Sequence, residues 1–287
     1  MKNKILTGLL LVLIGGWGSL SAQSAGSNYA RQVNTLIGTK GVGLTSGYLY
    51  PGATYPYGMV QFTPSYFSKR SGFVINQLSG GGCEHMGNFP TFPVKGKLKM
   101  SPDNILNYRI NISEEKGHAG YYEAKVQEDI HAKLTVTERT GMASYEYPAD
   151  QQYGTVIIGG GISATPIEQA AIVITAPNKC EGYAEGGNFC GLRTPYKVYF
   201  VAEFDTDALE SGTWKRNELK PNTTFAEGEY SGVYFTFDVN KKKNIQYKIG
   251  VSYVSVENAR ENLKAENTGW DFLQIQNQAE SLSLIHI

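Results

Sequence analysis

Short runs of alternating apolar and polar side chains fill most of the chain between residues 28 and 255. In His131–Arg139, the apolar side chains of Ala132, Leu134 and Val136 point to one side of an extended strand, and the residues between them point to the other. Ile245–Val256 repeats this pattern, with apolar or aromatic side chains at every second position. The alternation predicts strands that bury one face.

Other segments extend this prediction to the whole region. Two short runs are continuously apolar, as expected for strands buried on both faces: Thr155–Ile158 and Ala171–Thr175. Further strand candidates are Tyr121–Gln127, Met142–Tyr147, Lys197–Phe204 and Gly232–Asp238. Many short strands separated by glycine and proline turns are typical of a sandwich. We therefore expect a mainly β chain with a β-sandwich domain over residues 28–255.

The hydrophobic period changes at Val256. The spacing of Val256, Ala259 and Leu263 predicts a helix, and Thr268–Asp271 is a capping-box pattern that would open a second one. The apolar stripe of that second helix is formed by Phe272, Ile275 and Ala279. Residues 256–281 are thus predicted to be a helical linker. We expect Trp270, Phe272 and Ile275 to leave apolar surface exposed.

The two ends of the chain do not fit the domain pattern. Residues 1–23 have Lys2 and Lys4 before an uncharged apolar run and small residues after it, which predicts a cleaved export signal and a periplasmic, cell-surface or secreted protein. The run is short for a bilayer span of ~20 residues, so no stable membrane insertion is expected, although an uncleaved anchor is the alternative. Residues 282–287 resemble a translated sequencing adapter, which would make the chain a fragment; a natural apolar tail is the alternative.

Composition narrows the range of partners. The 287 residues include 26 basic and 26 acidic side chains, and this balance argues against a nucleic-acid groove, which needs a basic excess. With 33 glycines, 19 tyrosines and only 18% charged residues, the chain suits an all-β extracellular protein that handles neutral polar ligands such as sugars. Of the three cysteines, Cys180 and Cys190 bracket a glycine-rich segment and could close a small loop, leaving Cys83 free.

One loop combines backbone freedom with reactive side chains. It runs through the predicted substrate-binding residues Ser79, Gly80, Gly81, Gly82, Cys83, Glu84 and His85. Consecutive glycines let a backbone approach a ligand closely, although a plain surface loop would have the same composition. Glu84 alone cannot hydrolyse a glycosidic bond, because that reaction needs two carboxyl groups. The sequence therefore predicts binding residues here and no catalytic residue.

A second loop is rich in tyrosine, proline and glycine. Residues 47–61 form a stiff turn in which Tyr55 is the predicted sugar-stacking residue, and packing of the tyrosines beneath the loop is the alternative. Signatures for phosphate-binding loops, serine nucleophile elbows and zinc helices are absent from the sequence, and its four histidines are dispersed. We predict no metal site within this chain.

Several colinear segments resemble glycoside hydrolase family 92, the calcium-dependent exo-α-mannosidases. The segments that carry the resemblance are Val33–Thr39, Pro51–Gln61, Leu78–Cys83, Gly120–Tyr122, Leu134–Arg139, Val198–Phe204 and Val254–Ala259. Two segments depart from the family's pattern and put the linkage preference in doubt: Phe73–Gln77 and Glu84–Pro90.

The resemblance implies an N-terminal β-sandwich of the supersandwich kind, a helical linker and a C-terminal (α/α)6 barrel. It also implies inverting hydrolysis of terminal α-mannosides of N-glycans or mannans, with calcium. The catalytic carboxylates and most calcium ligands would lie on the barrel, which this chain does not reach. The partners would then be a mannose-containing oligosaccharide and the chain's own C-terminal catalytic domain. The alternatives are a free-standing carbohydrate-binding module and an N-glycan amidase with a second β domain.

Overall fold

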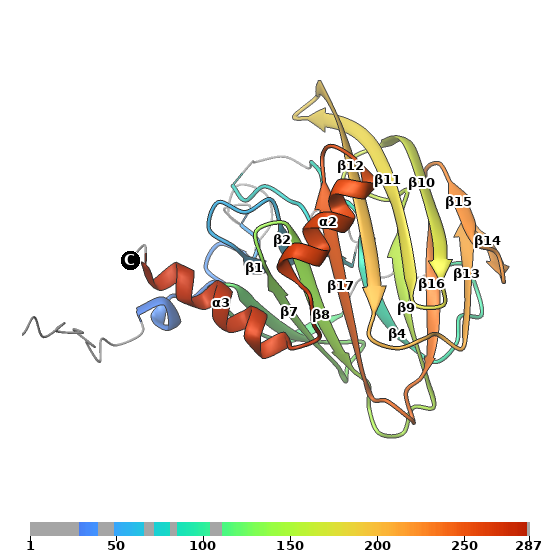
Figure 1. The fold of residues 1–287 in the computed structure, drawn as a ribbon, viewed down its shortest axis with the longest axis horizontal. Coiled ribbons are helices and arrows are strands. Elements are labelled where there is room, and N and C mark those ends of the chain that lie inside the picture. The colour runs from blue at the N-terminus through green and yellow to red at the C-terminus, as the bar shows by residue number, and fades with distance from the viewer. Residues whose placement is uncertain (1–28, 40–48, 66–71, 81–84, 104–110, 286–287) are drawn as a thin grey trace, which may run out of the picture.

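Two large antiparallel β-sheets pack face to face in this protein (Figure 1). The structure is a computed structural model and describes residues 29–39, 49–65, 72–80, 85–103 and 111–285. The mainly β class and the predicted sandwich are confirmed. The predicted signal, residues 1–23, lies outside the described residues.

The two sheets contain eight and nine strands. The eight-stranded sheet has the spatial order β1 (Ala53–Thr54), β2 (Gln61–Pro64), β3 (Phe73–Val74), β4 (Thr91–Lys95), β9 (Tyr153–Gly159), β16 (Ser231–Asp238), β13 (Glu210–Lys215) and β14 (Glu218–Pro221). The nine-stranded sheet has the order β15 (Phe225–Glu227), β10 (Ile167–Ala176), β11 (Lys179–Phe189), β12 (Leu192–Phe204), β17 (Asn244–Ser252), β8 (Thr140–Glu146), β7 (Ile130–Val136), β6 (Tyr121–Val126) and β5 (Ile112–His118).

The core lies between the sheets and follows the period-two pattern of the sequence. On β7, Ala132, Leu134 and Val136 are fully buried, and on β17 the inward positions run from Ile245 to Val251. The predicted strand Ile245–Val256 ends at Ser252, where the chain turns into a helix. All of the strand candidates from the sequence are strands in the structure, with ends that differ by a few residues.

Strand β11 was not predicted, because its sequence is rich in small residues. Its inward positions are Cys180, Gly182, Ala184 and Gly186, which are buried between exposed or half-buried neighbours. Small side chains at the inward positions give no alternation of apolar and polar residues, so the sequence pattern does not indicate a strand here. The strand is nevertheless central, since β10 and β12 pair with it on either side over most of its length.

Both long helices lie on the outer face of the nine-stranded sheet (Figure 1). Helix α2 (Val256–Glu266) begins after Ser255, whose Oγ accepts a hydrogen bond from the Asn258 N–H at 3.1 Å. Its Ala259 and Leu263 are buried against Val201 of β12. The predicted stripe of this helix is confirmed.

Helix α3 (Phe272–Ile285) begins later than the capping box indicates. The carboxylate of Asp271, rather than the hydroxyl of Thr268, accepts the hydrogen bond of the first turn, from the Gln274 N–H at 3.0 Å. Residues 268–270 instead form the bend between the helices. There Lys248 of β17 donates to the Asn267 carbonyl at 2.9 Å, and its ammonium lies 4.4 Å from the centre of the Trp270 ring.

The predicted exposure of the linker's apolar residues is wrong. Phe272 and Ile275 are buried against Met142 of β8, and Trp270 packs partly buried beside them. The side chain of Glu280 on the same helix accepts two hydrogen bonds from the guanidinium of Arg31, at 2.6 and 2.9 Å. The outer face of the nine-stranded sheet is apolar at these positions, so the apolar side chains of α3 are buried against it.

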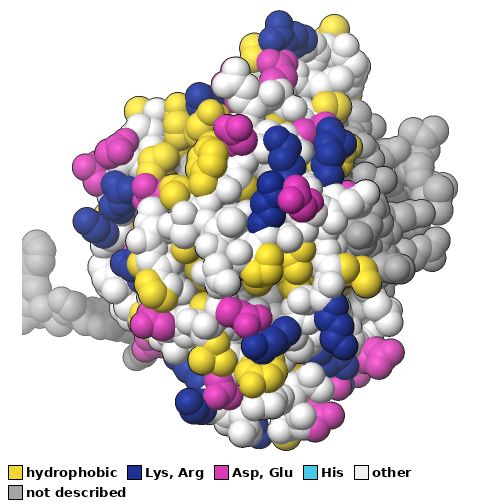
Figure 2. All heavy atoms as spheres, turned by 90° about the vertical axis from the view of Figure 1, so that its right-hand side faces the viewer, with side chains coloured by type: hydrophobic (Ala, Val, Ile, Leu, Met, Phe, Trp, Pro, Cys, Tyr) yellow, Lys and Arg dark blue, Asp and Glu magenta, His cyan; other side chains and the backbone are white. Residues whose placement is uncertain are grey.

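Charges are mixed on the surface. Figure 2 shows basic and acidic side chains interspersed with small apolar patches over the edge formed by β13, β14 and β15. This agrees with the 26 basic and 26 acidic residues of the sequence. None of the described helices is long and apolar enough to cross a membrane.

The packing of α3 against the sheet can be tested at Gly120. This residue has φ 71°, and a Cβ built on it would lie 2.4 Å from the Ala279 Cβ. Gly120→Ala is expected to lower the free energy of unfolding by about 2–4 kcal/mol, because steric overlap adds to the cost of the left-handed backbone. Urea denaturation measures the change.

Gly96 provides the matched control. It has φ 75° with no atom within 4 Å of an added Cβ, so Gly96→Ala is expected to cost only about 1–2 kcal/mol of backbone strain. An equal loss in the free energy of unfolding for the two variants would show that α3 does not pack closely against Gly120.

Candidate substrate-binding site

Two buried asparagines close the base of the glycine loop. The Asn88 N–H donates to Asn76 Oδ1 at 2.8 Å, and Asn76 Nδ2 donates to Asn88 Oδ1 at 3.1 Å. The backbone joins the same two sides, because the Gly87 N–H donates to the Asn76 carbonyl at 2.6 Å. Both asparagines are almost fully buried, so this base is a fixed platform for the loop.

Two tyrosines, one on β12 and one directly after β17, extend the platform. The Tyr196 hydroxyl donates to Asn88 Oδ1 at 2.9 Å, and Asn76 Nδ2 donates to the Tyr253 hydroxyl at 3.3 Å. Burial raises the pKa of Tyr196 to about 12. The phenol therefore stays neutral and keeps donating its hydrogen bond at physiological pH.

The predicted loop residues occupy different positions around this platform. Ser79 and Gly80 are exposed, while His85 is only 3% exposed. His85 Nε2 accepts a hydrogen bond from the Leu78 N–H at 2.9 Å, and its ring meets the Phe189 ring edge-on at 5.2 Å. His85 thus joins the two sides of the loop to the tip of the β11–β12 hairpin. The remaining predicted residues lie outside the described part of the chain: Gly81, Gly82, Cys83 and Glu84.

A cavity of about 260 Å³ lies between the loop and that hairpin. Its lining includes Leu78, His85, Phe189 and Tyr196 and is mostly apolar. The loop is also connected to the tyrosine-rich segment, because Gln77 Nε2 donates to the Tyr50 hydroxyl at 2.8 Å. The structure therefore joins two segments that the sequence analysis identified separately.

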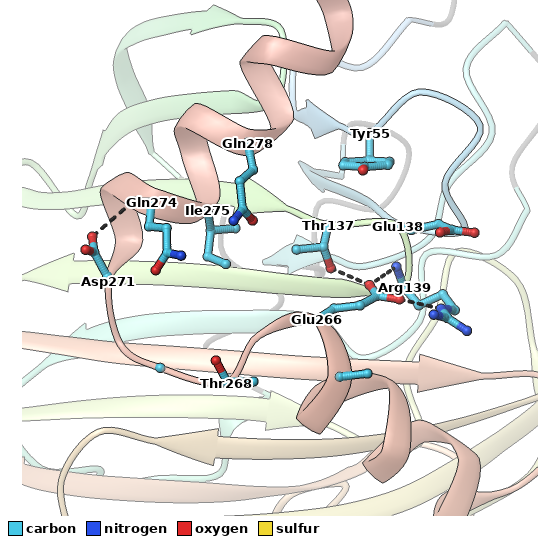
Figure 3. A pocket seen from close by; sticks show the side chains of 12 residues that line it. Tyr55, Thr137, Glu138, Arg139, Glu266, Thr268, Asp271, Gln274, Ile275 and Gln278 are labelled. Atoms are coloured by element: carbon cyan, nitrogen blue, oxygen red, sulfur yellow. Dashed lines mark hydrogen bonds and ion pairs between the residues drawn. The ribbon is translucent and has the colours of Figure 1, made fainter.

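Tyr55 lies in a different cavity, of about 370 Å³ (Figure 3). The ring is half-buried, and its pKa is raised first by burial and then by the charges of Glu138 and Glu266. The cavity is bounded by the loop after β1, the β7–β8 turn, the α2–α3 connection and α3. Tyr57, by contrast, is 96% exposed. Tyr57 is thus displayed at the surface, whereas Tyr55 is partly packed against the sandwich.

Glu266 forms one wall of this cavity and binds the β7–β8 turn. Its Oε2 accepts hydrogen bonds from Thr137 Oγ1 at 2.6 Å and from the Arg139 N–H at 2.8 Å. Its Oε1 accepts from Arg139 Nε, completing an ion pair. Both oxygens of the carboxylate are used in holding the end of α2 to the turn.

A calcium site does not fit the described residues. Calcium takes six to eight oxygen ligands, several of them carboxylates. Within the described ranges no three His, Cys, Asp or Glu side chains gather closely enough to hold a metal, and Glu266 is already paired with Arg139. No step that involves calcium is therefore derived for this part of the protein.

The predicted pairing of Cys180 with Cys190 is wrong. Cys180 is a buried free thiol, while Cys190 is disulfide-bonded. The intervening segment is strand β11 rather than a loop, and an extended chain of this length spans about 35 Å. The third cysteine of the sequence, Cys83, lies outside the described residues.

The double-sheet sandwich with helices on one outer face defines the class of this chain as a mainly β sandwich domain. The family described as "Glycosyl hydrolase family 92 N-terminal domain" matches residues 32–252. The chain belongs to this family. The resemblance noted in the sequence is confirmed.

Known proteins of this class are similar over the whole sandwich. A family 92 α-mannosidase from Bacteroides thetaiotaomicron is 23% identical, with a TM-score of 0.76, over 90% of this chain and 38% of its own. A family 92 inverting mannosidase from the same organism is 21% identical, with a TM-score of 0.71, over 88% of this chain and 35% of its own. At such identities the likeness shows the fold.

A curated relative comes from the fungus Arthroderma benhamiae. It is called an uncharacterized secreted glycosidase and is 26% identical over an alignment of 290 positions, which covers 88% of this chain and 37% of the relative. The chain thus spans less than two-fifths of the length of the relatives it matches.

The platform residues Asn76, Asn88, Tyr196 and Tyr253 were missed in the sequence. Asn76 and Asn88 flank the glycine loop, and this flanking is the one signal that points to them. The two tyrosines reach these asparagines from distant parts of the sequence, and no local pattern indicates such contacts. Sequence reasoning found the loop and missed the residues that support it.

The Glu266 contact predicts a loss of stability on substitution. Glu266→Gln removes the ion pair and leaves the Arg139 guanidinium without its carboxylate, so the free energy of unfolding is expected to fall by about 1–3 kcal/mol. Glu168→Gln is the control, since the Glu168–Arg193 pair is exposed to solvent and its loss should change the free energy of unfolding much less. Similar losses by denaturation for both variants would contradict the role given to Glu266.

Thiol titration tests the cysteine assignment. Burial and the neighbouring Glu181 raise the pKa of Cys180, so the native protein is expected to show no reaction with a thiol reagent. In guanidinium without reductant, one thiol per chain should react, and Cys180→Ser should abolish this signal. Retention of the signal in the Cys180→Ser variant would mean that another cysteine is the free one.

Proposed function

We propose that this chain is the N-terminal domain of an exported α-mannosidase that hydrolyses terminal α-mannosides of N-glycans or mannans with inversion. The observation that carries the proposal is the family match over residues 32–252, together with the fold shared with two mannosidases. One of those, the α-mannosidase from Bacteroides thetaiotaomicron, is also known in complex with mannoimidazole, a mannose-type ligand.

The role proposed for the described residues is to bind and orient the sugar. Ser79 and Gly80 lie exposed above the platform of Asn76 and Asn88, where hydroxyl and backbone N–H groups can meet a substrate. Inverting hydrolysis needs an acid and a base whose carboxyl groups stand roughly 6.5–9.5 Å apart to admit a water molecule. We assign that pair to the catalytic domain of the full-length protein.

Calcium belongs to the same proposal. When bound, the ion would supply a hard positive charge that holds and distorts the mannose ring. Its ligands are assigned to the catalytic domain, because the described residues of this chain do not form a suitable set. In this proposal Ser79 and Gly80 act on the substrate by hydrogen bonding.

Export is proposed from two observations. The first is the lysine-led apolar sequence of residues 1–23. The second is the name of the curated fungal relative, a secreted glycosidase. The proposed location is the periplasm, the cell surface or, after secretion, the medium.

Mannose release from an α-mannoside tests the function. The 287-residue chain is expected to release none, whereas the protein encoded by the gene with its continuation beyond residue 281 should release mannose and lose this activity with a calcium chelator. Calcium-dependent release by the chain alone would contradict the proposal. A longer protein that binds mannosides and never hydrolyses them would favour a carbohydrate-binding module.

A further inference from the structure

The cavity beside Tyr55 is built from three distant parts of the chain. The loop after β1, the β7–β8 turn and the segment from the end of α2 into α3 enclose about 370 Å³ (Figure 3). Ligand pockets start at roughly 300 Å³, so this space is sufficient for one sugar ring. The ion pair of Arg139 and Glu266 and the seating of α3 hold its walls in place.

Two carboxamides of α3 line the cavity one helical turn apart. The side chains of Gln274 and Gln278 both extend from the helix toward the open space (Figure 3). Among the described residues neither side chain has a hydrogen-bond partner, so both are available to a ligand. Each carboxamide offers donors and an acceptor, the combination that neighbouring sugar hydroxyls need.

The charges around the cavity select against anions. Arg139 is the single basic residue of the lining and is neutralised by Glu266, which leaves Glu138 and Asp271 as net negative charge. A phosphate, a sulfate or a uronic acid would be repelled there. A metal ion is disfavoured too, because no metal-binding group of acidic or histidine side chains occurs in the described ranges.

Tyr55 supplies an aromatic surface. Its ring is half-buried at the edge of the cavity, opposite the end of α2 (Figure 3). One face of a pyranose ring is lined by C–H groups, which pack against an aromatic ring, while its hydroxyls point outward. Amides, an aromatic ring and a surplus of negative charge together fit an uncharged polyhydroxy ligand.

We propose that this cavity binds one neutral hexopyranose residue, with Gln274 and Gln278 hydrogen-bonding its hydroxyls and Tyr55 packing against its ring. The inference goes beyond the proposed function, because it assigns a ligand to the sandwich and linker themselves. It requires no hydrolysis by the longer protein.

Calorimetric titration of the 287-residue chain with methyl α-mannopyranoside, methyl α-glucopyranoside and methyl α-galactopyranoside tests the pocket. Saturable binding of at least one is expected, with weaker binding of the anionic methyl glucuronate. Gln274→Ala and Gln278→Ala should each weaken binding about threefold to tenfold, the effect of one lost hydrogen bond. Asn277→Ala, an exposed carboxamide of α3 outside the lining, should bind like the parent.

Thermal melts check that every variant is folded. Absence of saturable binding to all three neutral glycosides overturns the proposal. So does binding that is unchanged in both glutamine variants, since the sugar would then sit elsewhere. Neither outcome affects the proposed function, which is read from mannose release by the longer protein.

Discussion

The contact between Glu266 and the β7–β8 turn organises the outer side of the molecule. The end of α2 is held to the sandwich by one carboxylate, which receives hydrogen bonds from Thr137 and Arg139. The bend that follows, fixed by Lys248, determines where α3 starts. Helix α3 in turn covers Met142 and completes the cavity that contains Tyr55. Without this contact α2 and α3 would still pack through their apolar faces, but the cavity would lose the ion pair that forms one of its walls.

Much of the fold could be predicted from the sequence because the main strands bury one face and follow a period of two. Strand β11 escaped prediction because Cys180 and Ala184 fill its inward positions with little hydrophobic contrast. The helical stripes were predicted correctly, but the surface they cover was not, since Met142 belongs to a strand far away in sequence. The candidate site could be predicted from the sequence to a similar extent. The glycine loop has a local signature, whereas the pairing of Asn76 with Asn88 exists only once the loop has folded back.

The loop end and the helix-covered outer face of the sandwich both present polar groups on a packed support. The core between the sheets is almost wholly apolar and supports both. At the loop end, buried amides and phenols are hydrogen-bonded to one another, so the exposed loop residues rest on a rigid base. On the helix-covered face, the polar side chains of α3 remain accessible above apolar contacts. A rigid support beneath accessible polar groups holds those groups in a fixed arrangement for a ligand.

The N-terminal cap of α3 has a geometric consequence. An α-helix turns by about 100° and advances about 1.5 Å with each residue. Because Asp271 marks the first turn and Phe272 and Ile275 are buried in the sheet surface, the rotational phase of the helix is set at its beginning. Every later position on α3 therefore points in a fixed direction relative to the sheets. One residue inserted after Ile275 would turn the rest of the helix through more than a quarter of a circle, and would lift Ala279 from Gly120 and Glu280 from Arg31.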